Sequence, residues 1–240
     1  MNPEIVYCEY PDDVAEAAAA LLLELQEEAI AERGVFRIAL SGGSTPALLF
    51  KLLASADWRD EMDFANWEVF WVDERAVAPT HKDSNYKLAQ DLFLSKVTVG
   101  EVFRMPAEHE NAREAAESYA RTLKGRFTPK TISFDAVLLG MGADGHTASL
   151  FPGTPALESG AVVEAVEVQG NAIPQRLTLT LRALNSAQAV IFLVTGAEKS
   201  ARLRDVLIDN DYRYPATRVN PHEGRLIWIV DDEAASELSD

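Results

Sequence analysis

The segment from residue 140 to residue 152 holds the side chains best suited to chemistry in this chain. It follows a mostly apolar run, residues 134–139, that is short enough to be a buried strand. Three glycines within six residues allow the backbone to turn sharply and to present N–H groups to a ligand. Asp144 and His146 lie two residues apart in this turn, and an imidazole can accept and release a proton near neutral pH. We therefore interpret the turn as the reaction centre.

A metal site is not expected at this turn. No second histidine lies at ligand spacing from His146, and an Asp with a single His is a poor site for zinc. His81, His109 and His222 lie in polar segments and are predicted to be surface residues.

Three further polar turns follow predicted strands. The first contains Ser41, Gly42, Gly43, Ser44 and Thr45, the second Asp73, Glu74 and Arg75, and the third leads from Thr195 to Lys199. A Gly-rich turn that opens a helix binds anions through its free N–H groups, and Lys199 lies where its ammonium would add to such a site. In a parallel sheet all these turns emerge at the carboxyl edge, where ligands bind. The four turns together therefore predict one site.

Apolar strand patterns alternate with helical patterns along the chain, which predicts an α/β fold with a doubly wound, mostly parallel sheet flanked by helices. Asp12 or Asp13 is expected to cap the first helix, Gly34 to end it, and Thr45 to cap a second helix that begins at Pro46. With no linker or repeat in view, residues 1–240 are expected to form one domain. The predicted strands cover residues 4–10, 35–40, 67–72, 102–104, 134–139, 175–180, 189–194 and 226–230, and residues 162–168 belong to a less regular part. The predicted helices cover 14–32, 46–54, 83–94, 111–124, 195–208 and a short C-terminal segment.

The charge and cysteine content exclude several classes of protein. A formal net charge of -16 over 240 residues would repel nucleic acids and anionic membranes. The single cysteine, Cys8, allows no internal disulfide, is expected in the core, and fits a reducing compartment. The sequence shows neither a signal-peptide pattern nor an apolar run near the ~20 residues of a membrane span. We expect a cytoplasmic protein that binds neither nucleic acid nor membrane.

Four segments of the sequence resemble motifs of the 6-phosphogluconolactonases, in the order of that family and over nearly the whole chain. They are residues 39–46, 71–75, 83–86 and 140–152, of which the last is the most specific. The related glucosamine-6-phosphate deaminases share the Gly-Gly turn, the Asp-Glu pair and the Asp-Gly-His loop. They carry a glutamate shortly after the histidine, where this chain has no carboxylate between Thr147 and Pro152, and a tyrosine in place of Arg75. Both departures favour the lactonases.

The resemblance implies a Rossmann-like, deaminase-like fold and the hydrolysis of 6-phospho-D-glucono-1,5-lactone in the oxidative pentose phosphate pathway. It implies no metal and no organic cofactor. The expected partner is the sugar-phosphate lactone, and the protein is expected to be a monomer or a weak homodimer.

The resemblance implies a site with two parts, one that binds phosphate and one that carries out the hydrolysis. Phosphate is expected to bind the turn from Ser41 to Thr45 together with Arg176 and Lys199, with Arg75 nearer the sugar. His146 is expected to act as base and then acid, and either Asp144 or Asp73 to orient it.

Two rival readings remain. One is an isomerase or deaminase of amino-sugar phosphates, which ammonia release would reveal. The other is a sugar-phosphate sensor without catalysis, which would need a basic DNA-binding segment.

Overall fold

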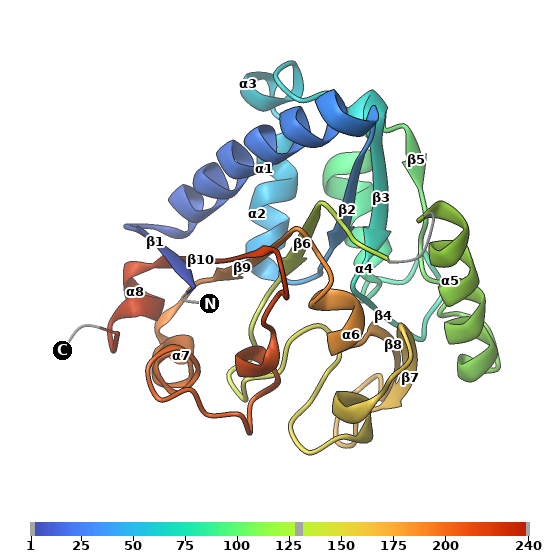
Figure 1. Ribbon diagram of the computed structural model, residues 1–240, viewed down its shortest axis with the longest axis vertical. Coiled ribbons are helices and arrows are strands. Elements are labelled where there is room, and N and C mark those ends of the chain that lie inside the picture. The colour runs from blue at the N-terminus through green and yellow to red at the C-terminus, as the bar shows by residue number, and fades with distance from the viewer. Residues whose placement is uncertain (1–2, 128–131, 239–240) are drawn as a thin grey trace.

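A parallel sheet forms the centre of the computed structural model, which describes residues 3–127 and 132–238. Seven strands lie in the order β1-β10-β9-β6-β2-β3-β5, and every neighbouring pair is parallel (Figure 1). The predicted α/β class is confirmed. The strands are β1 (Glu4–Cys8), β2 (Phe36–Leu40), β3 (Trp67–Trp71), β5 (Glu101–Val102), β6 (Ala136–Leu139), β9 (Ala189–Val194) and β10 (Arg225–Asp231).

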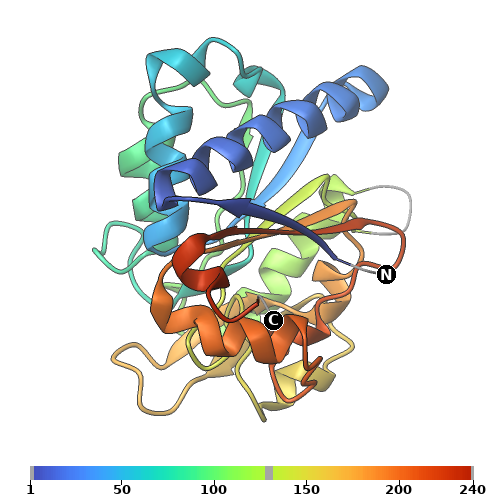
Figure 2. The same ribbon diagram turned by 90° about the vertical axis from the view of Figure 1, so that its left-hand side faces the viewer.

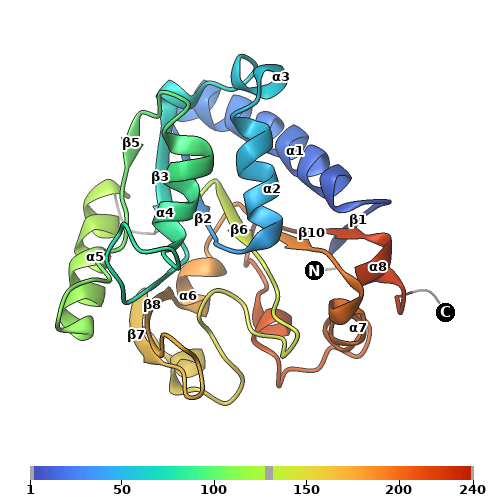
Figure 3. The same ribbon diagram turned by 180° about the vertical axis from the view of Figure 1, so that it is seen from behind.

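Helices cover both faces of this sheet because its central strands, β6 and β9, are buried along their whole length. Figure 2 shows α1 on one side of the sheet and α7 on the other. Figure 3 shows α2 and α4 side by side in front of β2 and β3. The helices are α1 (Pro11–Arg33), α2 (Ser44–Leu53), α3 (Ala56–Arg59), α4 (Asn85–Ala89), α5 (Ala112–Arg126), α6 (Leu181–Leu184), α7 (Ser200–Leu207) and α8 (Asp232–Ala235), with shorter turns η1 (Phe64–Asn66), η2 (Gln90–Leu94, a π-helix), η3 (Pro155–Glu158), η4 (Ala197–Lys199) and η5 (Pro215–Arg218). In the part of the chain so described, no helix combines the length and apolar character needed to cross a membrane.

A second, antiparallel sheet was not expected from the sequence. It contains β4 (Asp73–Arg75), β8 (Gln175–Leu179) and β7 (Val163–Glu167) in the order β4-β8-β7, next to α5 (Figure 1). The prediction that residues 73–75 form a turn is therefore wrong. They form a short strand because their backbone pairs with β8, about a hundred residues further along the chain.

Two predicted helix caps are also wrong. Tyr10 caps α1 instead of Asp12 or Asp13, because Pro11 supplies the helical φ at the first position, and Asp13 accepts the Tyr10 N–H at 3.0 Å. Gly43 caps α2 instead of Thr45, and its φ of 113° is a value that favours glycine. The predicted end of α1 at Gly34, with φ of 75°, is confirmed.

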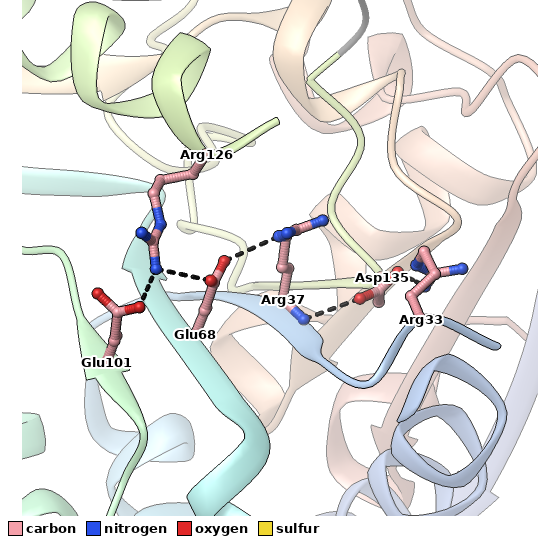
Figure 4. Close-up of polar contacts among 6 residues, drawn as sticks. All are labelled: Arg33, Arg37, Glu68, Glu101, Arg126 and Asp135. Carbon is pink, nitrogen blue, oxygen red and sulfur yellow. Dashed lines mark hydrogen bonds and ion pairs between the residues drawn. The ribbon is translucent and has the colours of Figure 1, made fainter. Parts of the chain in front are cut away.

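An ion-pair network joins the amino ends of four strands, at the edge of the sheet opposite the polar turns (Figure 4). Glu68 accepts hydrogen bonds at 2.8 Å from Arg37 and from Arg126, the latter also paired with Glu101. Asp135 accepts the Arg37 backbone N–H at 2.8 Å and pairs with Arg33.

Candidate active site

A cavity of about 260 Å³ opens at the carboxyl ends of β2, β6 and β9. Strand ends at a topological switch point are the usual ligand site of such sheets. Ten of the eleven residues predicted for the site line this cavity, and Asp144 lies behind one of them. The ten are Ser41, Gly42, Gly43, Ser44, Thr45, Asp73, Arg75, His146, Arg176 and Lys199.

His146 is held by the carboxylate two residues before it. Asp144 Oδ1 lies 2.5 Å from His146 Nδ1 and accepts the His146 backbone N–H at 3.2 Å. This side-chain hydrogen bond from His146 is the main cause that lowers the pKa of Asp144 to about 2. Because Nδ1 is occupied, Nε2 is the ring nitrogen available to a ligand in the cavity. The His146 side chain is 30% exposed, so solvent reaches it.

Two glycines make this geometry possible. A Cβ on Gly142 would lie 2.1 Å from His146 Nδ1, and one on Gly145 would lie 2.6 Å from the Tyr214 ring. Gly145 also has a φ of 78°, which side-chain-bearing residues rarely adopt. Gly142 is therefore required by the space that the Asp144–His146 pair occupies, and Gly145 by its backbone conformation and by the Tyr214 ring.

Asp73 does not contact His146, although it lines the same cavity. Its carboxylate accepts a hydrogen bond from Asn85 Nδ2 at 2.9 Å and one from Ser149 Oγ at 2.6 Å. Asn85 in turn packs so closely on Gly42 that a Cβ there would lie 1.9 Å from Asn85 Oδ1. Of the two carboxylates left open by the sequence, the one in contact with the imidazole is Asp144.

Glu74 supports the same wall of the cavity by holding the residues that carry Asn85. It is buried, and its carboxylate accepts hydrogen bonds from the backbone N–H groups of Arg75, Asn85 and Tyr86 and from Ser84 Oγ, all at 2.8–2.9 Å. Burial raises the pKa of Glu74, and the backbone hydrogen bonds oppose that rise. The bonds fix the start of α4, and with it Asn85.

Three cations face the cavity. Arg75 and Arg176 are directly opposite each other on the antiparallel strands β4 and β8, an unfavourable arrangement for like charges. Burial, and after it the charge of Arg75, lowers the pKa of Arg176. Lys199 adds a third cation, 3.8 Å from Glu198. A bound anion would offset this repulsion, so the geometry favours an anionic ligand.

The start of α2 supplies neutral donors to the same cavity. The N–H groups of its first turn have no partner within the helix, and they carry the positive end of the helix dipole. Thr45 Oγ1 lies 2.8 Å from Thr195 Oγ1, which ties the turn after β2 to the turn after β9. The predicted anion cradle at Ser41–Thr45 thus lies next to Lys199.

Sequence reasoning missed several residues of this site. Asn85, Thr195 and Glu198 line the cavity, while Ser149 and Glu74 hold its wall. Asn85 and the other four residues all lie within motifs or turns that the sequence marked, but none of them was given a role of its own. For Ser149 and Thr195 the reason is that their partners, Asp73 and Thr45, are distant in the chain. Within residues 3–127 and 132–238, no group of three or more His, Cys, Asp and Glu side chains is arranged to hold a metal ion.

Comparison with known proteins gives the same family as the motifs. A family model described as glucosamine-6-phosphate isomerases/6-phosphogluconolactonase matches residues 9–228. The chain is 40% identical over 233 residues to probable 6-phosphogluconolactonase 1 of Arabidopsis thaliana, covering 90% of this chain and 87% of that one. It is 35% identical over 255 residues to probable 6-phosphogluconolactonase 2 of Oryza sativa subsp. indica, covering 99% and 90%.

Solved structures agree in fold. The 6-phosphogluconolactonase of Trypanosoma brucei superposes with a TM-score of 0.87 at 28% identity, with 99% of each chain covered. A monomeric glucosamine-6-phosphate deaminase superposes with a TM-score of 0.83 at 19% identity, covering 98% of this chain and 99% of that one, which shows a shared fold alone. The chain belongs to the glucosamine-6-phosphate isomerase/6-phosphogluconolactonase family.

Proposed function

We propose that this enzyme hydrolyses 6-phospho-D-glucono-1,5-lactone to 6-phospho-D-gluconate, in the oxidative pentose phosphate pathway. Its relatives at 35–40% identity, matched over nearly their whole length, carry the name 6-phosphogluconolactonase. One observation carries the proposal: a single cavity is lined by His146, which Asp144 holds from behind, and by Arg75, Arg176 and Lys199. A proton acceptor and an anion site within one cavity are what a phosphorylated lactone requires.

His146 acts as the base and then as the acid. Nε2 takes a proton from water, and the hydroxide oxygen forms a bond to the lactone carbonyl carbon. As the tetrahedral intermediate collapses, the bond from that carbon to the ring oxygen breaks, and the ring oxygen takes the proton back from the imidazolium. The new carboxylic acid then loses its proton to solvent. Asp144 stabilises the imidazolium at Nδ1, and N–H groups of residues 140–145 are candidates to hold the oxyanion.

The phosphate is bound at the other end of the cavity. N–H groups and hydroxyls from Ser41 to Thr45 donate hydrogen bonds to it, and Arg176 and Lys199 supply charge. Arg75, opposite Arg176, lies where it can contact the phosphate or the developing carboxylate.

His146→Ala tests the catalytic half. Turnover should fall by about 10²–10⁴-fold with little change in KM, because general acid–base catalysis contributes that much. The assay must subtract spontaneous hydrolysis, since the lactone also opens in water. Unchanged turnover would remove His146 as the base, and release of ammonia from glucosamine 6-phosphate by the wild-type enzyme would favour the deaminase reading.

Lys199→Ala tests the binding half. KM for the phosphorylated lactone should rise about tenfold, the equivalent of one charge-assisted hydrogen bond. The unphosphorylated D-glucono-1,5-lactone is the matched control and should show no such rise. An equal rise for both lactones would show that Lys199 does not bind phosphate.

We also propose that the enzyme works in the cytoplasm, without metal or organic cofactor, as a monomer or a weak homodimer. The lone Cys8 suits a reducing compartment, although several Oryza sativa relatives are named as chloroplastic. Fractionation of the source cells tests the location, full activity after dialysis against a chelator tests the cofactor statement, and sedimentation tests the oligomeric state.

A further inference from the structure

Phe151 contacts the face of the His146 ring. The two rings are nearly parallel, with their centroids 4.3 Å apart and their planes at 17°. Asp144 holds the same imidazole by its edge, at Nδ1. A hydrogen bond to one ring atom fixes the position of that atom but leaves the tilt of the ring free. A second ring stacked on its face removes that remaining freedom.

A tight reversal of the chain places Phe151 there. Thr147 and Leu150 exchange backbone hydrogen bonds at 2.9 and 3.3 Å, and Ala148 between them has a φ of 50°. An alanine in the left-handed region costs roughly 1–2 kcal/mol, which persists only where the surroundings hold the backbone.

Two side chains anchor this reversal. Thr147 Oγ1 donates to the Gly140 carbonyl at 2.8 Å, and Ser149 Oγ donates to Asp73 at 2.6 Å. Ser149 is 1% exposed and Thr147 is fully buried, so the Ser149–Asp73 bond is shielded from water and the Thr147–Gly140 bond is partly shielded. The cavity wall at Asp73 and the end of β6 thereby fix where Phe151 lies.

Phe151 also contacts Arg176. The Arg176 guanidinium carbon lies 5.6 Å from the centre of the Phe151 ring, within the range of a cation–π contact. One aromatic ring therefore contacts both the His146 imidazole and a guanidinium that lines the same cavity.

We propose that Phe151 is a positioning residue, whose ring fixes the tilt of the His146 imidazole so that Nε2 faces the bound substrate. The kinetic part of this inference rests on the proposed lactonase function. The structural part concerns only the ligand-free protein and can be tested without any substrate.

Phe151→Leu removes the aromatic face and keeps an apolar side chain. Turnover should fall about tenfold or more, because small errors in the placement of a catalytic group cost that much. KM should change less than about twofold. Phe151→Tyr, which restores an aromatic face, should recover most of the turnover. Phe151→Met is the second variant, to be used if the leucine variant does not fold.

Phe103→Leu is the matched control. Phe103 is also partly buried, stacks on another ring (Phe70, 4.9 Å, 16°) and lies near a guanidinium (Arg126, 4.5 Å). Unlike His146 and Arg176, these two partners do not line the cavity. The Phe103→Leu variant should lose about as much stability as Phe151→Leu but keep the turnover of the wild type. Equal turnover in the Phe151→Leu and Phe103→Leu variants would overturn the proposal.

NMR of the ligand-free protein with labelled histidines gives the independent readout. In the wild type, the ring current of Phe151 should displace the His146 ring-proton signals from those of His81, His109 and His222, which are all exposed. In Phe151→Leu these signals should move toward the exposed set and show averaging over several ring orientations. Unchanged His146 signals would contradict the proposal. A wild type that lacks lactonase activity but shows the NMR change would refute the proposed function and leave the positioning role intact.

Discussion

Asp144 and His146 form a hydrogen-bonded pair in which Asp144 orients the imidazole and His146 keeps Asp144 ionised. Their hydrogen bond fixes Nδ1 as the inner ring nitrogen and lowers the pKa of Asp144 to about 2. The carboxylate therefore stays ionised throughout the neutral range, ready to stabilise a positive charge on the imidazole.

Asp144→Asn should lower both turnover and stability at pH 7. With His146 as the proposed base, turnover should fall by as much as about 10⁴-fold, the loss in serine proteases when the carboxylate behind the histidine is neutralised. A carboxyl whose pKa is lowered on folding stabilises the folded state above its unfolded pKa of about 3.9. That contribution disappears as the pH falls through about 2.

Urea unfolding at several pH values measures this effect. The stability gap between the wild type and Asp144→Asn should be full at pH 7 and should shrink below about pH 4, where the unfolded carboxyl begins to bind a proton. Asp91→Asn, which removes an exposed Asp paired with Lys87, should leave turnover unchanged. A stability difference between the two proteins that does not change with pH would contradict the lowered pKa of Asp144.

Arg176 is a second residue whose pKa depends on its surroundings. Burial and the facing Arg75 disfavour its charge while the cavity holds no anion. Arg176→Gln should therefore raise the free energy of unfolding of the ligand-free protein by about 1 kcal/mol, or about 2–4 °C in Tm. Millimolar phosphate should raise the Tm of the wild type and not that of the variant. A variant that is less stable without ligand would show that Arg176 is balanced by other groups.

At the scale of elements, the network in Figure 4 connects α1, α5 and the amino ends of the strands at the far edge of the sheet. Glu68 is its centre, because it accepts from both Arg37 and Arg126 while its side chain is only 12% exposed. A poorly hydrated carboxylate with two guanidinium partners stabilises far more than an exposed one.

Glu68→Gln should lower the free energy of unfolding by about 2 kcal/mol, since it leaves two partly buried cations without their shared partner. Glu101→Gln is the control: Glu101 also pairs with Arg126 but is 53% exposed, so its loss should cost no more than about 0.5 kcal/mol. Chemical denaturation measures both. Equal losses would mean that burial does not set the strength of these pairs.

At the scale of the whole molecule, the net charge of -16 opposes the approach of an anionic substrate. The screening length is about 30 Å at 0.01 M salt and about 8 Å at 0.15 M. At low salt the whole acidic surface acts on the substrate, whereas near physiological salt only nearby groups such as Arg75, Arg176 and Lys199 do.

Raising the salt concentration over this range should therefore increase kcat/KM for the phosphorylated lactone a few-fold, by increasing the rate of encounter. The neutral D-glucono-1,5-lactone should show no change. A steady decrease in kcat/KM with salt would show that the cavity's cations dominate even at long range.

Features that depend on neighbouring residues could be predicted from the sequence. Apolar runs of strand length predicted β6 and β9, and Gly34 predicted the end of α1. The Asp144–His146 contact is also local, because a glycine-rich turn brings together two side chains only two residues apart.

Features that depend on partners distant in the chain became visible only in the folded protein. The three residues Asp73–Arg75 became a strand because they pair with β8, and that pairing placed Arg75 opposite Arg176. The fold also places Asp73 where it accepts hydrogen bonds from Asn85 and Ser149. It stacks the Phe151 ring on His146. Sequence periodicity reports which face of an element is buried, but the identity of the partner is set by long-range packing of the whole chain.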